Sequence, residues 1–98
     1  MAMSVEFDAA ARVEFDDAFN WYAQRSRGAA IGFATEIDVA IEAVTADPNR
    51  FQQTYAGCQF YRLKRYPYCV IYYRVRNSVR VVAVAHAKRR PAYWRERL

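Results

Sequence analysis

Glycine, proline and cysteine are scarce in this sequence, whose 98 residues include three, three and two of them, respectively. So few glycines and prolines exclude collagen-like and low-complexity proteins, and they favour regular elements with short connections. Cys58 and Cys69 are too few for a disulfide framework and lack the spacing of a metal site. We therefore expect a reduced cytoplasmic protein with no metal and no other cofactor.

Long hydrophobic runs are also missing. The longest, residues 28–34, falls well short of the roughly 18 residues that a membrane span requires. The first six residues have neither the basic region nor the apolar region of a secretory signal. Hydrophobic residues nevertheless make up 54% of the chain and aromatic residues 16%, which is enough for a buried core. The sequence predicts one soluble domain over residues 1–98.

Acidic residues are rare in the second half of the chain. Residues 1–50 contain four Arg and nine acidic residues, a formal charge of −5. Residues 51–98 contain eleven Lys or Arg and one acidic residue, Glu96, a formal charge of +10. Such a division predicts a basic surface for a polyanion or for an acidic partner protein.

Helical periodicity dominates the first half. Asp8 is expected to cap a first helix that begins at Ala9 and ends near residues 25–27, with Gly28 in its C-terminal turn. A second helix is expected to end before Pro48, because the residue before a proline disfavours helical backbone. The apolar stripes of the two helices are Ala11, Phe15, Ala18, Phe19 and Tyr22, and Phe33, Ile37, Ala40, Ile41 and Val44.

Extended patterns lie on both sides of these helices. The expected strands cover residues 3–7, 60–66, 68–75 and 79–87. The last of them is apolar on both of its faces, so we expect it to be a central strand. Pro91 is expected to begin a short C-terminal helix that ends at Arg97. The predicted fold class is α+β, in the order β-α-α-β-β-β with a short C-terminal helix, and with the helical hairpin on one face of an antiparallel sheet.

Basic residues gather in three groups. They are Arg62, Lys64 and Arg65; Arg74, Arg76 and Arg80; and Lys88, Arg89, Arg90, Arg95 and Arg97. The middle group is interpreted as solvated loop charges. The C-terminal group is interleaved with Tyr93 and Trp94, and the combination of cations with aromatic rings is suited to phosphates and bases.

Three other features are open to a functional or a structural interpretation. His86 is the only histidine, and a lone histidine is more often a structural hydrogen-bonding residue than a catalyst. Val13 and Trp21 point away from the first apolar stripe, so Trp21 is either a partner contact or folds back onto the β layer. Four glutamates are interpreted as solvent-facing: Glu6, Glu14, Glu36 and Glu42.

Several short segments, taken in order, carry a resemblance to a known family. They are Trp21-Tyr22, Phe33, Ile37-Asp38, Ala40-Ile41, Asp47-Pro48-Asn49-Arg50-Phe51, YRLKRYPYCVIYYRV at residues 61–75 and AVAHAKRRPAYW at residues 83–94. Together they resemble the ParE/RelE family of toxins from type II toxin–antitoxin modules. The resemblance implies a small toxin that is neutralised by a cognate antitoxin.

The resemblance also implies a mode of neutralisation. The antitoxin would wrap the toxin, and the candidate contacts are Trp21, Tyr22, Arg74 and Arg80. The division of charge between the two halves predicts that its C-terminal segment binds with acidic and apolar side chains. Coupled folding and binding of such a segment can cover a large surface.

The family divides by target, and each branch implies a different set of site residues. RelE-like members are ribosome-dependent endoribonucleases of mRNA, and the matching positions here are Arg62, Lys64, Arg65, His86 and Tyr93. ParE-like members inhibit DNA gyrase and are not nucleases. The ending Arg-Arg-Pro-Ala-Tyr-Trp resembles the ParE side, so gyrase inhibition is the favoured interpretation and ribonuclease activity on mRNA the alternative. The implied gyrase contacts are Lys88, Arg89, Arg90, Tyr93 and Trp94.

Two expectations depend on packing. A shift of one residue in the strand at 60–66 would send Arg62 and Lys64 to the other face of the sheet, so their surroundings stay open. A terminal helix is expected to contribute little to the core, so Trp94 is expected to be removable with little loss of fold.

Overall fold

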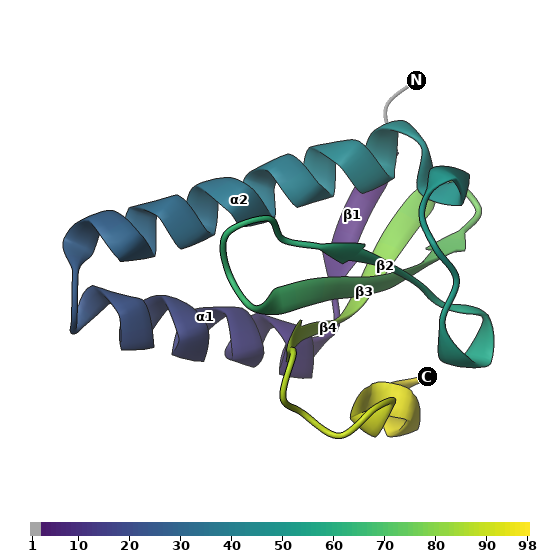
Figure 1. The fold of residues 1–98 in the computed structure, drawn as a ribbon. Coiled ribbons are helices and arrows are strands. Elements are labelled where there is room, and N and C mark those ends of the chain that lie inside the picture. The colour runs from purple at the N-terminus through teal and green to yellow at the C-terminus, as the bar shows by residue number, and fades with distance from the viewer. Residues whose placement is uncertain (1–2) are drawn as a thin grey trace.

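Two long helices and four strands make up most of the described chain, residues 3–98 of the computed structural model (Figure 1). In chain order they are β1 (Ser4–Phe7), α1 (Ala9–Ala23), α2 (Arg27–Ala46), β2 (Gln59–Arg62), β3 (Tyr68–Val75) and β4 (Ser78–His86). Short 3-10 helices cover Pro48–Arg50, Tyr55–Gly57 and Tyr93–Arg97. The predicted α+β class and order of elements are confirmed. No helix within residues 3–98 is long and apolar enough to cross a membrane.

The sheet has the strand order β1-β4-β3-β2. β4 lies between β1 and β3, as its two apolar faces predict. β3 pairs antiparallel with β4 and with β2, whereas β1 pairs parallel with β4. The sheet is therefore mixed, and the expectation of an antiparallel sheet is wrong for β1. α1 and α2 cover one face (Figure 1). We call the opposite face the open face.

Both helices begin at a side-chain cap. The Asp8 carboxylate accepts a hydrogen bond from the Ala10 amide at 2.9 Å, as predicted, and the Ser26 hydroxyl oxygen accepts one from the Ala29 amide at 3.2 Å. α1 ends at Ala23, earlier than expected, and Gly28 lies in the first turn of α2 instead of closing α1. The first helix ends early because Ser26 caps the second helix, which begins at Arg27.

Aromatic rings join the helical hairpin to the sheet. Tyr22 of α1 and Phe33 of α2 pack on each other and on Tyr66 and Tyr68. Gly32 lies against the hydroxyl end of Tyr66, and that hydroxyl donates a hydrogen bond to the Ala29 carbonyl at 2.8 Å. The buried residues of this core are Ala11, Ala18, Phe33, Ile37, Ala40, Leu63, Val70, Val81 and Val84.

β2 is shorter than predicted, because it ends at Arg62 instead of continuing to Tyr66. The amides of Lys64 and Arg65 donate hydrogen bonds to the Glu36 carboxylate of α2, at 2.9 and 3.2 Å. These two amides therefore lie in a turn and bind a side chain, whereas in a continued strand they would be available to pair with β3. Glu36, interpreted from the sequence as a solvent-facing residue, fixes this turn to α2.

β4 contains a bulge that changes the facing of its side chains. Ile71 pairs with Ala83 and Tyr72 with Val81, which leaves Val82 without a partner residue on β3. Val81 therefore belongs to the core under the helices, whereas Val82 and Ala83 both face the open side. Regular alternation would have put Val81 and Val84, three residues apart, on opposite faces, whereas the bulge lets both face the helices.

Candidate functional site

Glu14 of α1 holds the C-terminal segment of the chain. Its carboxylate accepts a hydrogen bond from the Tyr93 hydroxyl at 2.6 Å and two from the Arg97 guanidinium at 2.9 Å each. The side chains of Glu14 and Arg97 are only 15% and 19% exposed. The prediction of a solvent-facing Glu14 is therefore wrong. We call Glu14, Tyr93 and Arg97 the C-terminal clamp.

The clamp lies where β4 loses its neighbouring strand. β1 pairs with β4 only as far as Val81, because the chain then turns into α1. Beyond that point the Val84 amide donates to Glu14 at 3.0 Å, and the Val82 carbonyl accepts from Arg97 at 3.0 Å. The Glu14 carboxylate and the Arg97 guanidinium thus bind the backbone groups of β4 that a neighbouring strand would otherwise bind. Without them, these groups would be left unpaired at the edge of the sheet, at a cost in free energy.

The Tyr93 hydroxyl donates its proton to a hydrogen bond within this clamp. Burial and the hydrogen bond to Glu14 raise the pKa of Tyr93 well above its ordinary value. The Arg89 guanidinium lies 3.8 Å from the centre of the Tyr93 ring, and that of Arg97 lies at 5.2 Å. A hydroxyl with a raised pKa that already donates to a carboxylate is a poor proton donor for another reaction.

Trp94 belongs to the core of the open face. Its side chain is 3% exposed and packs with Cys58, Ile71, Val82, Ala83 and Ala85. The expected helix from Pro91 to Arg97 is a 3-10 helix over Tyr93–Arg97, and it follows Ala92 in left-handed conformation at φ 58°. The small side chains of Ala83 and Ala85 leave room for the indole ring. The expectation that this segment adds little to the core, so that Trp94 is removable with little loss of fold, is wrong.

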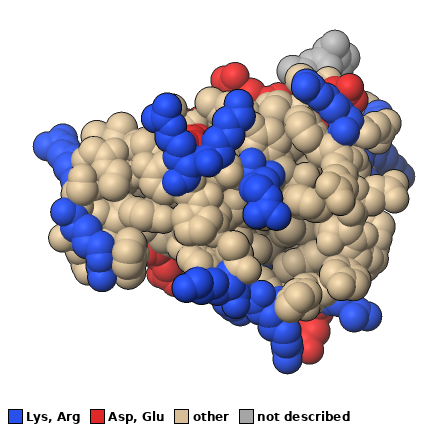
Figure 2. Space-filling view, viewed as in Figure 1, with Lys and Arg blue, Asp and Glu red and all other residues tan. Residues whose placement is uncertain are grey.

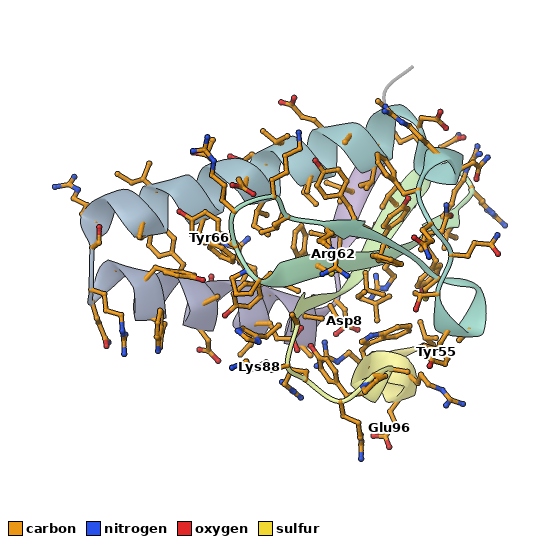
Figure 3. The ribbon with its side chains drawn as sticks, viewed as in Figure 1. Asp8, Tyr55, Arg62, Tyr66, Lys88 and Glu96 are labelled. Atoms are coloured by element: carbon orange, nitrogen blue, oxygen red, sulfur yellow. The ribbon has the colours of Figure 1, made fainter. Side chains whose placement is uncertain are left out.

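Three successive cations remain exposed between β4 and the 3-10 helix. We call residues 87–92, which contain Lys88, Arg89 and Arg90, the basic loop. Figure 3 shows Lys88 at the end of β4, and Figure 2 shows Lys and Arg side chains along the lower rim of the same view. The loop is anchored on one side by β4 and on the other by the clamp and Trp94.

His86 has a structural role at the start of the basic loop. Its Nδ1 accepts a hydrogen bond from the Lys88 amide at 3.0 Å, and its carbonyl accepts one from the Arg89 amide at 3.0 Å. The ring packs edge-to-face against Tyr68, with 5.0 Å between ring centres. An accepting Nδ1 leaves the proton of the neutral ring on Nε2.

The five residues of the nuclease set are only partly brought together. Arg62 pairs with Cys69 and lies on β2 (Figure 3). It faces the open side, where it borders a hollow of about 240 Å³ together with His86 and Tyr93. Lys64 and Arg65 lie in the turn held by Glu36 and are not among the described residues around this hollow.

The four candidate antitoxin contacts lie at two ends of the molecule. Trp21 is 52% exposed beside the end of β4, and the Arg25 guanidinium lies 3.5 Å from its ring centre. Trp21 therefore does not fold back onto the β layer, whereas Tyr22 does turn into the core.

Arg80 lies at the other end of β4, where it pairs with Glu6 at 3.3 Å and Asp8 at 3.9 Å. Arg74 is exposed nearby on β3. Arg80 and His86 are six residues apart along β4, or about 20 Å at the usual rise of a strand.

A family model described as the ParE toxin of the type II toxin–antitoxin system parDE matches residues 5–91. This chain belongs to the ParE toxin family. The match ends before Tyr93, so the ParE region contains Glu14 but not its two partners in the clamp.

One solved structure, described as the chromosomal ParDE toxin–antitoxin system from P. aeruginosa, has the same fold. The TM-score is 0.76 over 89% of this chain and 98% of that chain, with 13% sequence identity. A search of curated proteins gave no match.

Proposed function

We propose that this ParE toxin inhibits DNA gyrase in the cytoplasm, and that the basic loop makes the contact. The observation that supports the proposal most directly is the arrangement of Lys88, Arg89 and Arg90, three exposed cations on a loop with both ends anchored. A pre-organised loop loses little conformational entropy when it binds. Exposed charges at the rim of an interface also accelerate encounter with a negatively charged partner.

The first experiment is a supercoiling assay with purified toxin and gyrase. Inhibition should fall in the variant Lys88→Gln with Arg90→Gln, because the loop loses two of its charges. The variant Arg74→Gln with Arg76→Gln is the matched control, since it removes two exposed cations from the β3–β4 hairpin. Equal inhibition by the wild type and the loop variant would refute the assignment of this surface.

The ribonuclease alternative has one supporting observation, the shared hollow of Arg62, His86 and Tyr93. For His86 Nδ1 to take up a proton in catalysis, its hydrogen bond with the Lys88 amide must first break. Tyr93 would have to act through a hydroxyl that already donates a hydrogen bond to Glu14. Translation-coupled cleavage of mRNA, measured on the same toxin preparation, separates the alternatives. Cleavage that is lost in folded His86→Ala, together with unimpaired supercoiling by gyrase, would establish the ribonuclease.

We further propose that a cognate antitoxin neutralises the toxin with an extended segment. Trp21 beside the end of β4 and Arg80 near its start are too far apart for one compact contact. A segment with acidic and apolar side chains that orders on binding could reach both. Expression of the toxin alone should arrest bacterial growth, and co-expression of the antitoxin should restore it. Normal growth with soluble, strongly expressed toxin would count against both statements.

A further inference from the structure

We propose that Glu14 is a positioning residue for the toxic activity: it sets the place of the basic loop by anchoring Tyr93 and Arg97. This inference rests on the proposed role of that loop. Glu14 lies on α1, far along the chain from the loop. Its carboxylate nevertheless accepts hydrogen bonds from Tyr93 and Arg97, which both follow the loop. The loop can change position only if these contacts break or the loop itself deforms.

The carboxylate is suited to this task by the number and direction of its bonds. One oxygen accepts from the Val84 amide and Arg97, and the other accepts from Tyr93 and Arg97. Three separate elements, α1, β4 and the C-terminal 3-10 helix, therefore meet at one group. Charge-assisted, bidentate bonds of this kind fix geometry better than single neutral bonds.

Without the clamp, the C-terminal segment keeps one large anchor, the buried Trp94. The 3-10 helix is only five residues long and has no side-chain cap at its start. We therefore expect loss of Glu14 to give local release of residues 87–98, while the core between the helices and the sheet stays folded. If the competent position of the loop fell to about a tenth of the population, the apparent affinity for the target would fall about tenfold.

Two variants break the clamp from opposite sides. Glu14→Gln removes the charge but retains an oxygen for the Val84 amide, and Arg97→Met removes the guanidinium but retains much of the apolar stem. The matched controls are Glu42→Gln, on the exposed surface of α2, and Arg27→Met, at its exposed start. All four changes alter the charge by one.

The readouts are growth arrest from a titratable promoter, amide hydrogen exchange, and Trp94 fluorescence in a Trp21→Phe background. In both clamp variants the inducer needed for growth arrest should rise about tenfold. Exchange should accelerate at the Val84 amide and in residues 87–98 while α2 and β3 keep their protection, and Trp94 should become accessible to a quencher. The controls should match the wild type.

Three results would overturn the inference. Full toxicity with a released segment would show that the position of the loop is irrelevant. Loss of toxicity with accelerated exchange in α2 and β3 would show that Glu14 contributes stability to the whole fold instead. An unchanged Trp94 signal in both clamp variants would show that the segment has another anchor. Growth arrest does not presuppose gyrase, so a negative supercoiling assay leaves this test intact.

Discussion

The buried side chain of Trp94 stabilises the fold, so a substitution of Trp94 changes stability as well as any contact with a target. Its indole ring fills the open face of the sheet, so Trp94→Ala would leave a cavity among Ile71, Val82 and Ala83. We expect a loss of about 3–5 kcal/mol in the free energy of unfolding, measured by urea denaturation. Trp21→Ala, at a half-exposed position, should cost far less. Similar losses for the two variants would contradict the assignment of Trp94 to the core.

Tyr72 gives a pH-dependent test of a buried hydroxyl. Its side chain is fully buried and donates a hydrogen bond to the Pro48 carbonyl at 2.7 Å. Burial, and to a lesser degree Asp47, raise the pKa of Tyr72 to about 12. Because the folded-state pKa lies above the unfolded value of about 10, the resulting stability is present below pH 10 and is lost between pH 10 and 12.

The prediction is that the stability difference between the wild type and Tyr72→Phe shrinks as the pH rises. Between pH 10 and 12 the difference should fall by up to about 1.4 kcal/mol per pH unit, measured by urea unfolding. The other tyrosines are common to both proteins and cancel in the comparison. A difference that stayed constant from pH 9 to 11 would mean that Tyr72 ionises at its ordinary pKa.

α2 contacts the turn after β2 at Gly32. A Cβ atom on residue 32 would collide with the Tyr66 hydroxyl. Gly32→Ala should therefore lower the melting temperature, even though alanine favours a helix by about 1 kcal/mol over glycine. Gly28→Ala, in the first turn of the same helix, has only ordinary contacts and should not be destabilising.

A double variant tests the cause of the Gly32 effect. Tyr66→Phe removes the colliding oxygen together with its bond to the Ala29 carbonyl. Adding Tyr66→Phe to Gly32→Ala should therefore recover part of the melting temperature, although Tyr66→Phe alone should lower it. If the two losses simply added, the collision with the hydroxyl would not be the cause.

The periodic elements could be predicted from the sequence, but their ends and the clamp could not. The apolar stripe through Phe33 and Val44 defines α2, and a run of β-branched and aromatic residues between Pro67 and Arg76 defines β3, because both signals are local in the sequence. β2 ends early because Glu36, distant in sequence, binds the next two amides. Glu14 lies beside Ala18 at the border of the α1 stripe, which was the only signal of its burial. Its partners Tyr93 and Arg97 depend on tertiary packing.

The acidic and basic halves of the sequence form different parts of the fold. The acidic half forms β1 and the helical hairpin, and the basic half forms β2 to β4 and the C-terminal segment. Figure 2 shows Lys and Arg side chains across the centre and the lower rim of the face on which β2 and β3 lie in Figure 1. Glu14 of the acidic half pairs with Arg97 of the basic half, so this ion pair joins the two halves and leaves the net charge of +5 unchanged.

This surface leads to a prediction about the rate of antitoxin binding. An acidic segment should be attracted to the basic half before it makes apolar contacts, so the association rate should fall steeply as salt is raised. Stopped-flow measurements from 50 to 500 mM salt should show a decrease of about tenfold or more in the association rate.

Apolar contacts with Trp21 should mainly set the dissociation rate. Arg74→Gln with Arg76→Gln should lower the association rate, whereas Trp21→Ala should raise the dissociation rate. An association rate that did not change with salt would show that the charge division does not guide the encounter.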